Sequence, residues 1–435
     1  MALENAEVII GNIIHCTGRF ELQLMEKAFV IFQGSEILAV GEISALAETK
    51  IKLNLKDVKE TILKDSQLLI PGLIDTHIHA PQYPNCGLGY DKPLMEWLDT
   101  YTYKLEKKYT DLNFSEIVFD HLVRKNLDNG TTTACYFGVL FNDATKILVD
   151  SVKKYGQRAL IGKINMTTLA PEDYLETPEE SITNTLNFIE YVESIGSDLV
   201  KPIITPRFAL SVEMDLMKKL GQIAKEKNLH IQTHISENTV EVDMVKSKYQ
   251  MPYANVYDEA DLLTPKTILA HGIYLTDEEL ELIAERGSSI SHCPSSNTCL
   301  KSGLCDVKRI SKFGIKVGLG TDVSGGPSPY LIKVMSDALD VSVHISFREK
   351  NYEPLMYKDV FYLATLGGAE ALSLDRLIGN FQAGKQFDAL IIDLNVPDCT
   401  DYLIDCSPLE LLQKFIYTGD DRNILNVYVA GKKIK

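Results

Sequence analysis

Two histidines separated by one residue, His77 and His79, follow the apolar run over residues 68–74. In a β-strand, side chains at positions i and i+2 point the same way about 6.6 Å apart, so both imidazoles can face one metal ion. The spacing therefore indicates hydrolytic metal chemistry. The alternative for this motif alone is an ordinary pair of buried histidines.

Three later residues, each directly after a short apolar run, strengthen the metal interpretation: His234, His271 and Asp322. The predicted ligands are three imidazole nitrogens and one carboxylate oxygen, from His77, His79, His234 and Asp322. This set suits Zn²⁺ or Fe²⁺ and leaves a position for water, whose pKa a metal lowers from 15.7 to about 7. His271 would either complete the shell or hydrogen-bond that water, and Asp322 could instead cap a helix.

A carboxyl group stands close to the predicted metal ligands in the sequence. Glu237 lies three residues after His234, at the end of the same predicted strand. From there it can move a proton between the nucleophilic water and a ring nitrogen of a substrate without binding the metal. The alternative is that Glu237 only begins the following helix.

Other residue types near these strand ends suit contact with a heterocyclic ring. Barrel hydrolases with two metals usually carry a bridging lysine at the end of the fourth strand. Here the end of the fourth predicted strand holds Arg207 and Phe208, and Lys201 lies at its start. The sequence therefore predicts one metal per chain. Arg207 offers a planar fork of donors for a carbonyl oxygen, and Phe208 or Trp97 can stack on a ring. Gln82 adds a donor and an acceptor. Arg207 could equally pair with a rim carboxylate, and Trp97 could be a core residue.

The elements that must position these residues follow a repeated pattern. Between residues 70 and 375, short apolar runs alternate with longer amphipathic ones, as in repeated βα units. We predict eight strands, over residues 69–79, 131–137, 159–165, 202–208, 230–234, 267–271, 289–292 and 316–321. Helices are predicted over 215–227 and 276–286, the second with Thr276 and Glu279 as a capping box. The economical fold is a (β/α)8 TIM barrel, whose active site occupies the carboxyl-terminal rim. A doubly wound open sheet is the alternative.

The barrel leaves both ends of the chain unused. Each end contains β-like runs, with a turn predicted at residues 34–35, and an isolated hairpin is marginal in water. We therefore expect the ends to pair as one small discontinuous β-sandwich. The predicted division is residues 1–68 and 376–435 for the sandwich, and residues 69–375 for the catalytic barrel.

The bulk composition narrows the class of partner. The 435 residues carry a formal charge of −16, which argues against nucleic acid or an anionic membrane and favours a small neutral substrate. The start lacks a basic secretory region, and no apolar run approaches the roughly 20 residues of a membrane span. Eight cysteines without a Cys-x-x-Cys pair indicate reduced thiols and a cytoplasmic location.

The residues that suggest chemistry also carry a family resemblance. The run Pro-Gly-Leu-Ile-Asp-Thr-His-Ile-His over residues 71–79, with His234, His271 and Asp322, resembles the amidohydrolase superfamily. Further stretches are similar to its guanine-deaminating branch, namely residues 80–83, 129–137, 205–208, 291–294 and 419–423. The resemblance covers residues 70–425, and the N-terminal arm matches only generically.

This resemblance implies hydrolytic deamination of guanine to xanthine and ammonia in purine catabolism or salvage, by a zinc-dependent homodimer. It implies zinc ligation by His77, His79, His234 and Asp322. Glu237 would protonate the ring, Asp322 would accept a proton from water, and His271 would hold the hydroxide. The purine would contact Gln82, Trp97, Arg207 and Phe208, besides His234, Glu237 and Asp322. Two alternatives remain: another deaminase or dechlorinase of the superfamily, acting on an adenosine derivative, cytosine or a triazine, and a non-catalytic scaffold of the same fold.

Overall fold

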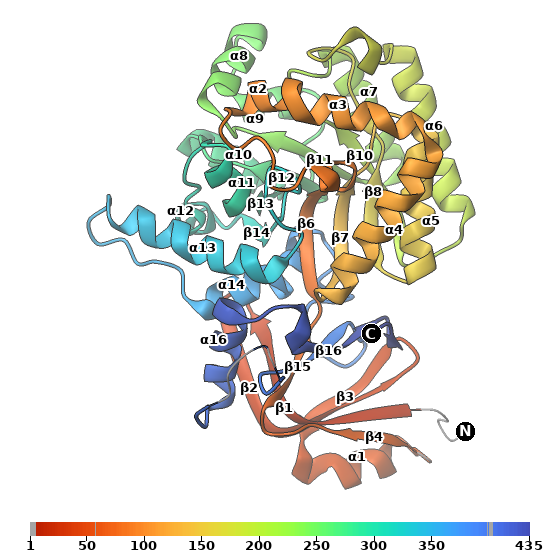
Figure 1. The fold of residues 1–435 in the computed structure, drawn as a ribbon, viewed down its shortest axis with the longest axis vertical. Coiled ribbons are helices and arrows are strands. Elements are labelled where there is room, and N and C mark those ends of the chain that lie inside the picture. Colours follow the sequence, from red (N-terminus) through yellow and green to blue (C-terminus); the bar gives the residue numbers. More distant parts are fainter. Residues whose placement is uncertain (1–5, 57, 398, 400–402) are drawn as a thin grey trace.

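The computed structural model describes residues 6–56, 58–397, 399 and 403–435. A barrel of parallel strands with helices on its outside forms the upper part of the molecule in Figure 1, and a second sheet lies below it. Both ends of the chain lie in the lower part. The two parts are joined by buried contacts, including an ion pair in which Arg158 Nη2 lies 3.0 Å from Asp388 Oδ1.

The barrel strands follow each other in chain order around the sheet, and neighbouring strands are parallel. They are β6 (Leu73–His79), β7 (Thr131–Phe137), β8 (Arg158–Gly162) with the short β9 (Ile164–Asn165), β10 (Val200–Pro206), β11 (His230–Ile235), β12 (Thr267–His271), β13 (Ser289–His292) and β14 (Lys316–Leu319). The first and last strands meet, because Thr76 Oγ1 donates to the carbonyl of Leu319 at 2.9 Å and the amide of Asp322 donates to the carbonyl of His77 at 2.9 Å. The predicted (β/α)8 barrel is confirmed, and the open sheet is excluded.

Helices cover the outside of the barrel and connect its strands. They are α4 (Leu112–Asp128), α5 (Asn142–Tyr155), α6 (Pro178–Ser194), α7 (Met214–Lys227), α8 (Thr239–Tyr249), α9 (Tyr253–Glu259), α10 (Asp277–Arg286), α11 (Pro294–Cys299), α12 (Val307–Lys312), α13 (Leu331–Ser346), α14 (Tyr357–Ala364) and α15 (Leu366–Ala371). The predicted capping box of α10 is present, since Thr276 Oγ1 accepts from the amide of Glu279 and the Glu279 carboxylate accepts from the amide of Thr276.

One connection is longer and more irregular than the rest. After β6 the chain forms a 3-10 segment (Ala80–Asn85), the short α2 (Leu94–Trp97), a π-helical turn (Leu98–Thr102) and α3 (Tyr103–Glu106) before it reaches α4. This excursion, residues 80–106, crosses the upper end of the barrel in Figure 1.

The second sheet combines both ends of the chain, as predicted. Its strands are β1 (Ala6–Gly18), β2 (Glu21–Gln33), β3 (Glu36–Glu42), β4 (Lys59–Ile62), β5 (Gln67–Pro71), β15 (Ala389–Asp393), β16 (Ile424–Val429) and β17 (Lys432–Lys433), with α1 (Leu46–Lys52) and α16 (Pro408–Thr418) beside them. The ends meet where β15 pairs antiparallel with β5. The strand predicted over 69–79 is wrong in one respect: it is divided at Gly72, where β5 leaves the second sheet and β6 enters the barrel. A Cβ at Gly72 would overlap the side chain of Thr132, so only glycine fits this close passage.

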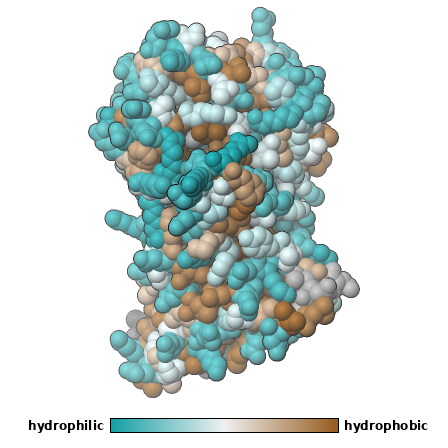
Figure 2. Space-filling model, turned by 90° about the vertical axis from the view of Figure 1, so that its left-hand side faces the viewer, coloured by the Kyte–Doolittle hydropathy of each residue, from teal (hydrophilic) through white to brown (hydrophobic). Residues whose placement is uncertain are grey.

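The surface is mixed in character. Figure 2 presents the side of the molecule on which α13 and α16 lie. Hydrophilic residues cover much of the barrel in this view, and hydrophobic residues are more frequent toward the middle and lower part of the molecule. Exposed hydrophobic side chains of these two helices and the segments beside them are Val343, Phe347, Met356, Leu403, Ile404 and Tyr417. Within the described residues, no helix combines the length and the apolar character that a membrane crossing requires.

Candidate active site

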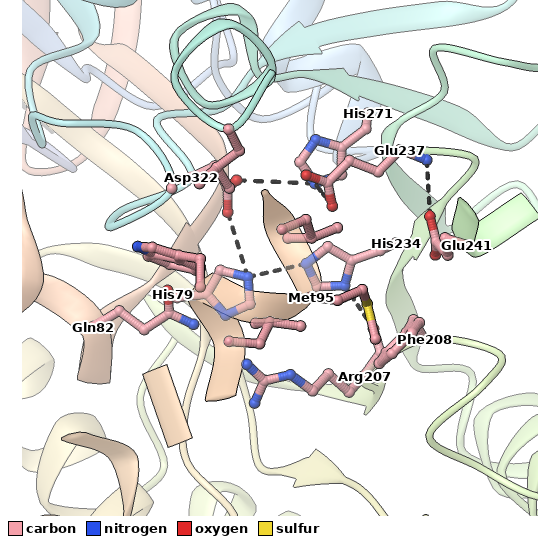
Figure 3. Close-up of a pocket in the computed structure, with 15 residues that line it drawn as sticks. His79, Gln82, Met95, Arg207, Phe208, His234, Glu237, Glu241, His271 and Asp322 are labelled. Atoms are coloured by element: carbon pink, nitrogen blue, oxygen red, sulfur yellow. Dashed lines mark hydrogen bonds and ion pairs between the residues drawn. The ribbon is translucent and has the colours of Figure 1, made fainter. Parts of the chain in front are cut away.

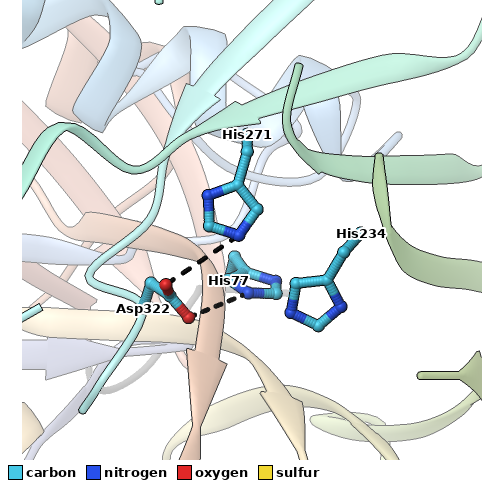
Figure 4. Close-up of side chains that lie close together, drawn as sticks. All are labelled: His77, His234, His271 and Asp322. Carbon is cyan, nitrogen blue, oxygen red and sulfur yellow. Dashed lines mark ion pairs between the residues drawn. The ribbon is translucent and has the colours of Figure 1, made fainter. Parts of the chain in front are cut away.

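Four potential metal ligands meet at the carboxyl-terminal rim of the barrel (Figure 4). They come from four different strand ends: His77 from β6, His234 from β11, His271 from β12 and Asp322 from the loop after β14. Their ligand atoms all lie within 4.8 Å of one another. Strands far apart in sequence thus bring three imidazoles and a carboxylate to one point, as the strand-end pattern predicted.

The donor set fits a divalent cation. The Nε2 atoms of His77 and His271 are buried and make no hydrogen bond of good geometry among the described residues. They face carboxylate oxygens, Asp322 Oδ1 at 3.2 Å from His77 and Glu237 Oε2 at 3.5 Å from His271, and a shared cation would satisfy them. Burial lowers the pKa of His77 and of His234, so each imidazole is neutral and can offer a lone pair. In spite of its own burial, the pKa of Asp322 is held below its ordinary value by the surrounding imidazoles. Neutral imidazoles at His77 and His234 with an ionised carboxylate at Asp322 are the kind of ligands that a metal hydrolase uses. In spite of its burial, the pKa of His271 is raised by the nearby carboxylates of Glu237 and Asp322.

His79 lies at the edge of this cluster. Its Nε2 is 3.0 Å from Nε2 of His234 and 3.4 Å from Oδ1 of Asp322. The four mutually closest ligands therefore include His271, where the predicted set has His79. The two sets share His77, His234 and Asp322, and ligation by His79 remains a prediction.

Two of the imidazoles are oriented by hydrogen bonds to their other ring nitrogen. Nδ1 of His234 lies 2.6 Å from the carbonyl oxygen of Arg207, which can only accept, so this nitrogen carries the proton and Nε2 faces the cluster. Nδ1 of His271 lies 2.8 Å from Oδ1 of Asn297, a residue of α11. Asn297 was not predicted, because an asparagine in a helical segment gives no signal of such a role.

A buried carboxylate joins the two strand ends that carry the cluster. Asp75 accepts hydrogen bonds from Oγ1 of Thr321 at 2.6 Å, from the amide of Thr321 at 3.1 Å and from the amide of His77 at 3.1 Å. Burial raises the pKa of Asp75 to about 7. Asp75 was also not predicted, although an aspartate inside an apolar strand is a visible signal. It fixes His77 and the backbone before Asp322 in one arrangement.

Beside the cluster lies a pocket that is lined by side chains of the strand ends, of the loops after them and of the excursion over residues 80–106 (Figure 3). The predicted residues that line it are His79, Gln82, Trp97, Arg207, Phe208, His234, Glu237, His271 and Asp322. Lining residues that were not predicted are Leu94, Met95, Leu98, Glu241, Leu300 and Gly325. Most of the additional apolar wall comes from the excursion over residues 80–106, whose irregular pattern gave no prediction.

Glu237 lies beside the cluster, at the wall of the pocket. Its Oε2 lies 3.5 Å from Nε2 of His271, and its Oε1 accepts from Oγ of Ser302 at 3.1 Å. Burial raises the pKa of Glu237 to about 7, so it can gain and lose a proton near neutrality. The helix α8 begins only at Thr239, after the N-cap Asn238. Glu237 therefore lies before the helix and faces the pocket.

The opposite side of the pocket carries donors for a polar ring edge. In Figure 3, Gln82 and Arg207 lie across the pocket from His271 and Glu237. The guanidinium of Arg207 pairs with a carboxylate, as the alternative interpretation held, but the partner is the buried Glu106 of α3. Trp97 is both a core residue, 2% exposed, and part of the pocket wall, and its Nε1 donates to the carbonyl of Leu88.

Comparison with known proteins agrees with this geometry. A family model described as "Amidohydrolase family" matches residues 68–434. The chain belongs to the amidohydrolase family. This amidohydrolase is 43% identical to a guanine deaminase of Rattus norvegicus over 99% of this chain and 97% of the relative. It is 34% identical to a guanine deaminase of Escherichia coli over 85% of this chain and 83% of the relative.

A solved structure is also similar over the whole length. The crystal structure of a guanine deaminase from C. acetobutylicum with guanine bound in its active site has 33% sequence identity and a TM-score of 0.90. The match covers 99% of this amidohydrolase and 100% of that chain. The barrel and the second sheet are therefore a shared architecture.

Proposed function

We propose that this amidohydrolase catalyses the hydrolytic deamination of guanine to xanthine and ammonia. The observation that carries the proposal is the full-length similarity to a guanine deaminase that holds guanine in its active site. The pocket supports the same substrate, because it combines the candidate metal ligands, a buried carboxyl group and donors for a carbonyl oxygen.

We further propose one Zn²⁺ per chain. The ligands would be His77, His234 and Asp322 with either His79 or His271, and an Fe²⁺ ion would suit the same nitrogen-rich set. When bound, the cation supplies a water molecule whose pKa is lowered to about 7.

The protein's own groups would handle the protons. Addition of water to the ring carbon that bears the amino group requires a proton on the adjacent ring nitrogen, and loss of ammonia requires another on the amino group. Glu237 takes the first of these protons from the water and delivers it to the ring nitrogen, because its carboxyl group is buried at the pocket wall with a pKa of about 7. Asp322 accepts the second proton of the water at a carboxylate oxygen and passes it to the departing amino group, so both carboxyl groups return to their starting states. Where His79 is the fourth ligand, His271 would hold the water by a hydrogen bond from Nε2.

Binding of the base would use the opposite wall. Arg207 and Gln82 donate to the carbonyl edge of guanine, and Phe208 and Trp97 contact the ring faces. A pocket that hydrogen-bonds its substrate in this way rejects a base that lacks those groups, because its buried polar atoms would be left without partners.

Assembly and location are part of the same proposal. We expect a homodimer, because the hydrophobic side chains of α13, α16 and the segments beside them are exposed on one side of the chain. We expect a cytoplasmic location, because the eight cysteines contain no Cys-x-x-Cys pair. Light scattering of the purified protein tests the first expectation, and fractionation of the source cells tests the second.

The function is tested on the purified, metal-loaded protein. Ultraviolet absorbance would follow the conversion of guanine, and ammonia release would be measured on guanine, an adenosine derivative, cytosine and a triazine. Elemental analysis of the same sample gives the metal and its stoichiometry. Turnover of guanine above all other compounds is expected; turnover of another member of the panel with none on guanine would overturn the proposal.

A further inference from the structure

One carboxylate outside the metal cluster holds both of the polar side chains that face the base. Glu106, the last residue of α3, is 1% exposed. Its Oε2 accepts from Nη1 of Arg207 at 2.6 Å, and its Oε1 accepts from Nη2 of Arg207 at 3.2 Å and from Nε2 of Gln82 at 2.9 Å. The hydroxyl of Tyr174 also donates to Oε2, at 2.8 Å.

These contacts fix the direction of the Gln82 amide. Its Nε2 donates to Glu106, while its Oε1 accepts from the amide of Ser324 at 3.2 Å. The amide plane therefore has one arrangement that satisfies both partners. The guanidinium of Arg207 is fixed as well, since two of its nitrogens meet the carboxylate and its Cζ lies 5.3 Å from the centroid of the Tyr103 ring.

Glu106 also determines the charge of this wall. Burial alone would lower the pKa of Arg207, but the Glu106 carboxylate raises it above its ordinary value, so the arginine is a cation. Arg207 and Glu106 are 3% and 1% exposed, and as an ion pair they carry no net charge. Without the carboxylate, a buried guanidinium would face the pocket uncompensated and would attract an anion.

We propose that Glu106 is a positioning residue that selects a neutral base: it orients Arg207 and Gln82 toward the carbonyl edge and cancels the arginine's charge against anionic heterocycles. The inference rests on the proposed deamination of guanine, because it assigns Arg207 and Gln82 to that base. A purely structural role would lower the stability of a Glu106 variant without changing which charge of ligand the pocket prefers.

The test compares the full-length, metal-loaded protein with Glu106→Gln. Steady-state kinetics give kcat and KM for guanine, and inhibition is measured with urate, a purine that is an anion at neutral pH. A hydrogen bond to a charged group corresponds to about 10- to 100-fold in affinity, so KM for guanine should rise by about that factor while kcat falls less. Inhibition by urate should tighten by about 10-fold or more, with an unchanged metal content.

Two further variants separate position from charge. Glu106→Asp keeps the charge but is too short to reach both partners, so KM for guanine should rise while inhibition by urate stays at the wild-type level. Tyr174→Phe is the matched control, because it removes one hydrogen bond to Glu106 and leaves both the charge and the bonds to Arg207 and Gln82. It should change neither KM nor urate inhibition by more than about 3-fold.

Each outcome decides the inference. Wild-type KM in Glu106→Asp overturns the positioning role, even where Glu106→Gln does not fold. If urate inhibits the wild type and Glu106→Gln equally well, the charge role is overturned. The charge role is also overturned if urate inhibits Glu106→Asp, which keeps the charge, as tightly as it inhibits Glu106→Gln. If the wild-type protein binds urate but does not convert guanine, the proposed function is refuted instead. Calorimetry of urate binding to the wild type and to the Glu106 variants would then still test the charge role.

Discussion

Replacing Glu237 by glutamine removes proton transfer and little else. The side chains have nearly the same shape, and Ser302 Oγ can donate to the amide oxygen of glutamine as it does to the Oε1 of Glu237 at 3.1 Å. The metal ligands around it are not changed. We therefore expect Glu237→Gln to keep its metal and its fold and to lose most of its turnover of guanine.

The expected loss of turnover in Glu237→Gln follows from the pKa of the carboxyl group that is removed. General acid–base catalysis typically contributes 10²- to 10⁴-fold. Burial brings the pKa of Glu237 to about 7, which is the value at which both protonation states are populated and transfer is most effective. We expect a loss of kcat toward the upper part of that range, at about 1.36 kcal/mol of activation free energy for each factor of ten.

The assay is ultraviolet absorbance of guanine conversion, with elemental analysis of the same preparation. Glu279→Gln is the matched control: Glu279 is also a buried glutamate, but its carboxylate accepts from the amides of Ala254 and Thr276, away from the pocket. Its loss should lower the melting temperature and leave kcat within about 3-fold, since a backbone hydrogen bond contributes to stability and not to chemistry. A Glu237→Gln protein with near-normal kcat would refute the proton-transfer role.

Three other perturbations test the metal cluster and the pocket. Removal of the metal by a chelator should abolish turnover and lower the melting temperature, and Zn²⁺ should restore both. The reason is that a ligand of the folded state stabilises it by about 2.7 kcal/mol when its concentration is 100 times its Kd. An unchanged calorimetric melting temperature would argue against a bound cation. Arg207→Ala should raise KM for guanine by about 100-fold and lower the stability of the fold, because Glu106 loses its partner. Elemental analysis should still find the metal in this variant, because the backbone carbonyl that meets His234 remains. Gly320→Ala should cost about 1–3 kcal/mol by urea denaturation and weaken metal binding, since the new Cβ would lie 2.8 Å from Cβ of His77; an unshifted midpoint would contradict this close packing.

The strands of the barrel could be predicted closely from the sequence. β7, β12 and β13 have the predicted bounds, because each is a short run that is buried over its whole length and followed directly by a turn or helix. The division at Gly72 could not be predicted in the same way. β5 and β6 are both fully buried, so the apolar pattern continues across the point where the chain passes from one sheet to the other.

The site was predictable mainly where a strand end carried the chemistry. In the excursion over residues 80–106, the predicted Gln82 and Trp97 line the pocket, but Glu106 was not predicted. His234, His271 and Asp322 follow apolar runs, so the barrel geometry alone brings them together. Glu106, Asn297 and Ser302 lie in helices or loops, and their contacts depend on tertiary packing: Glu106 meets Arg207 across 101 positions of sequence. A lone glutamate in an irregular segment looks like a solvated side chain, and burial is what distinguishes it.

The residues at the strand ends and the residues of the excursion belong to two different parts of the fold. The strand ends and the loop after β14 hold the candidate metal ligands, which are joined to each other through the backbone and Asp75. The excursion over residues 80–106 supplies Gln82, the apolar wall and Glu106, and it meets the barrel at Arg207. There the backbone carbonyl of Arg207 orients His234, while its side chain lines the pocket. Choice of substrate can therefore change through the excursion while the catalytic rim stays as it is.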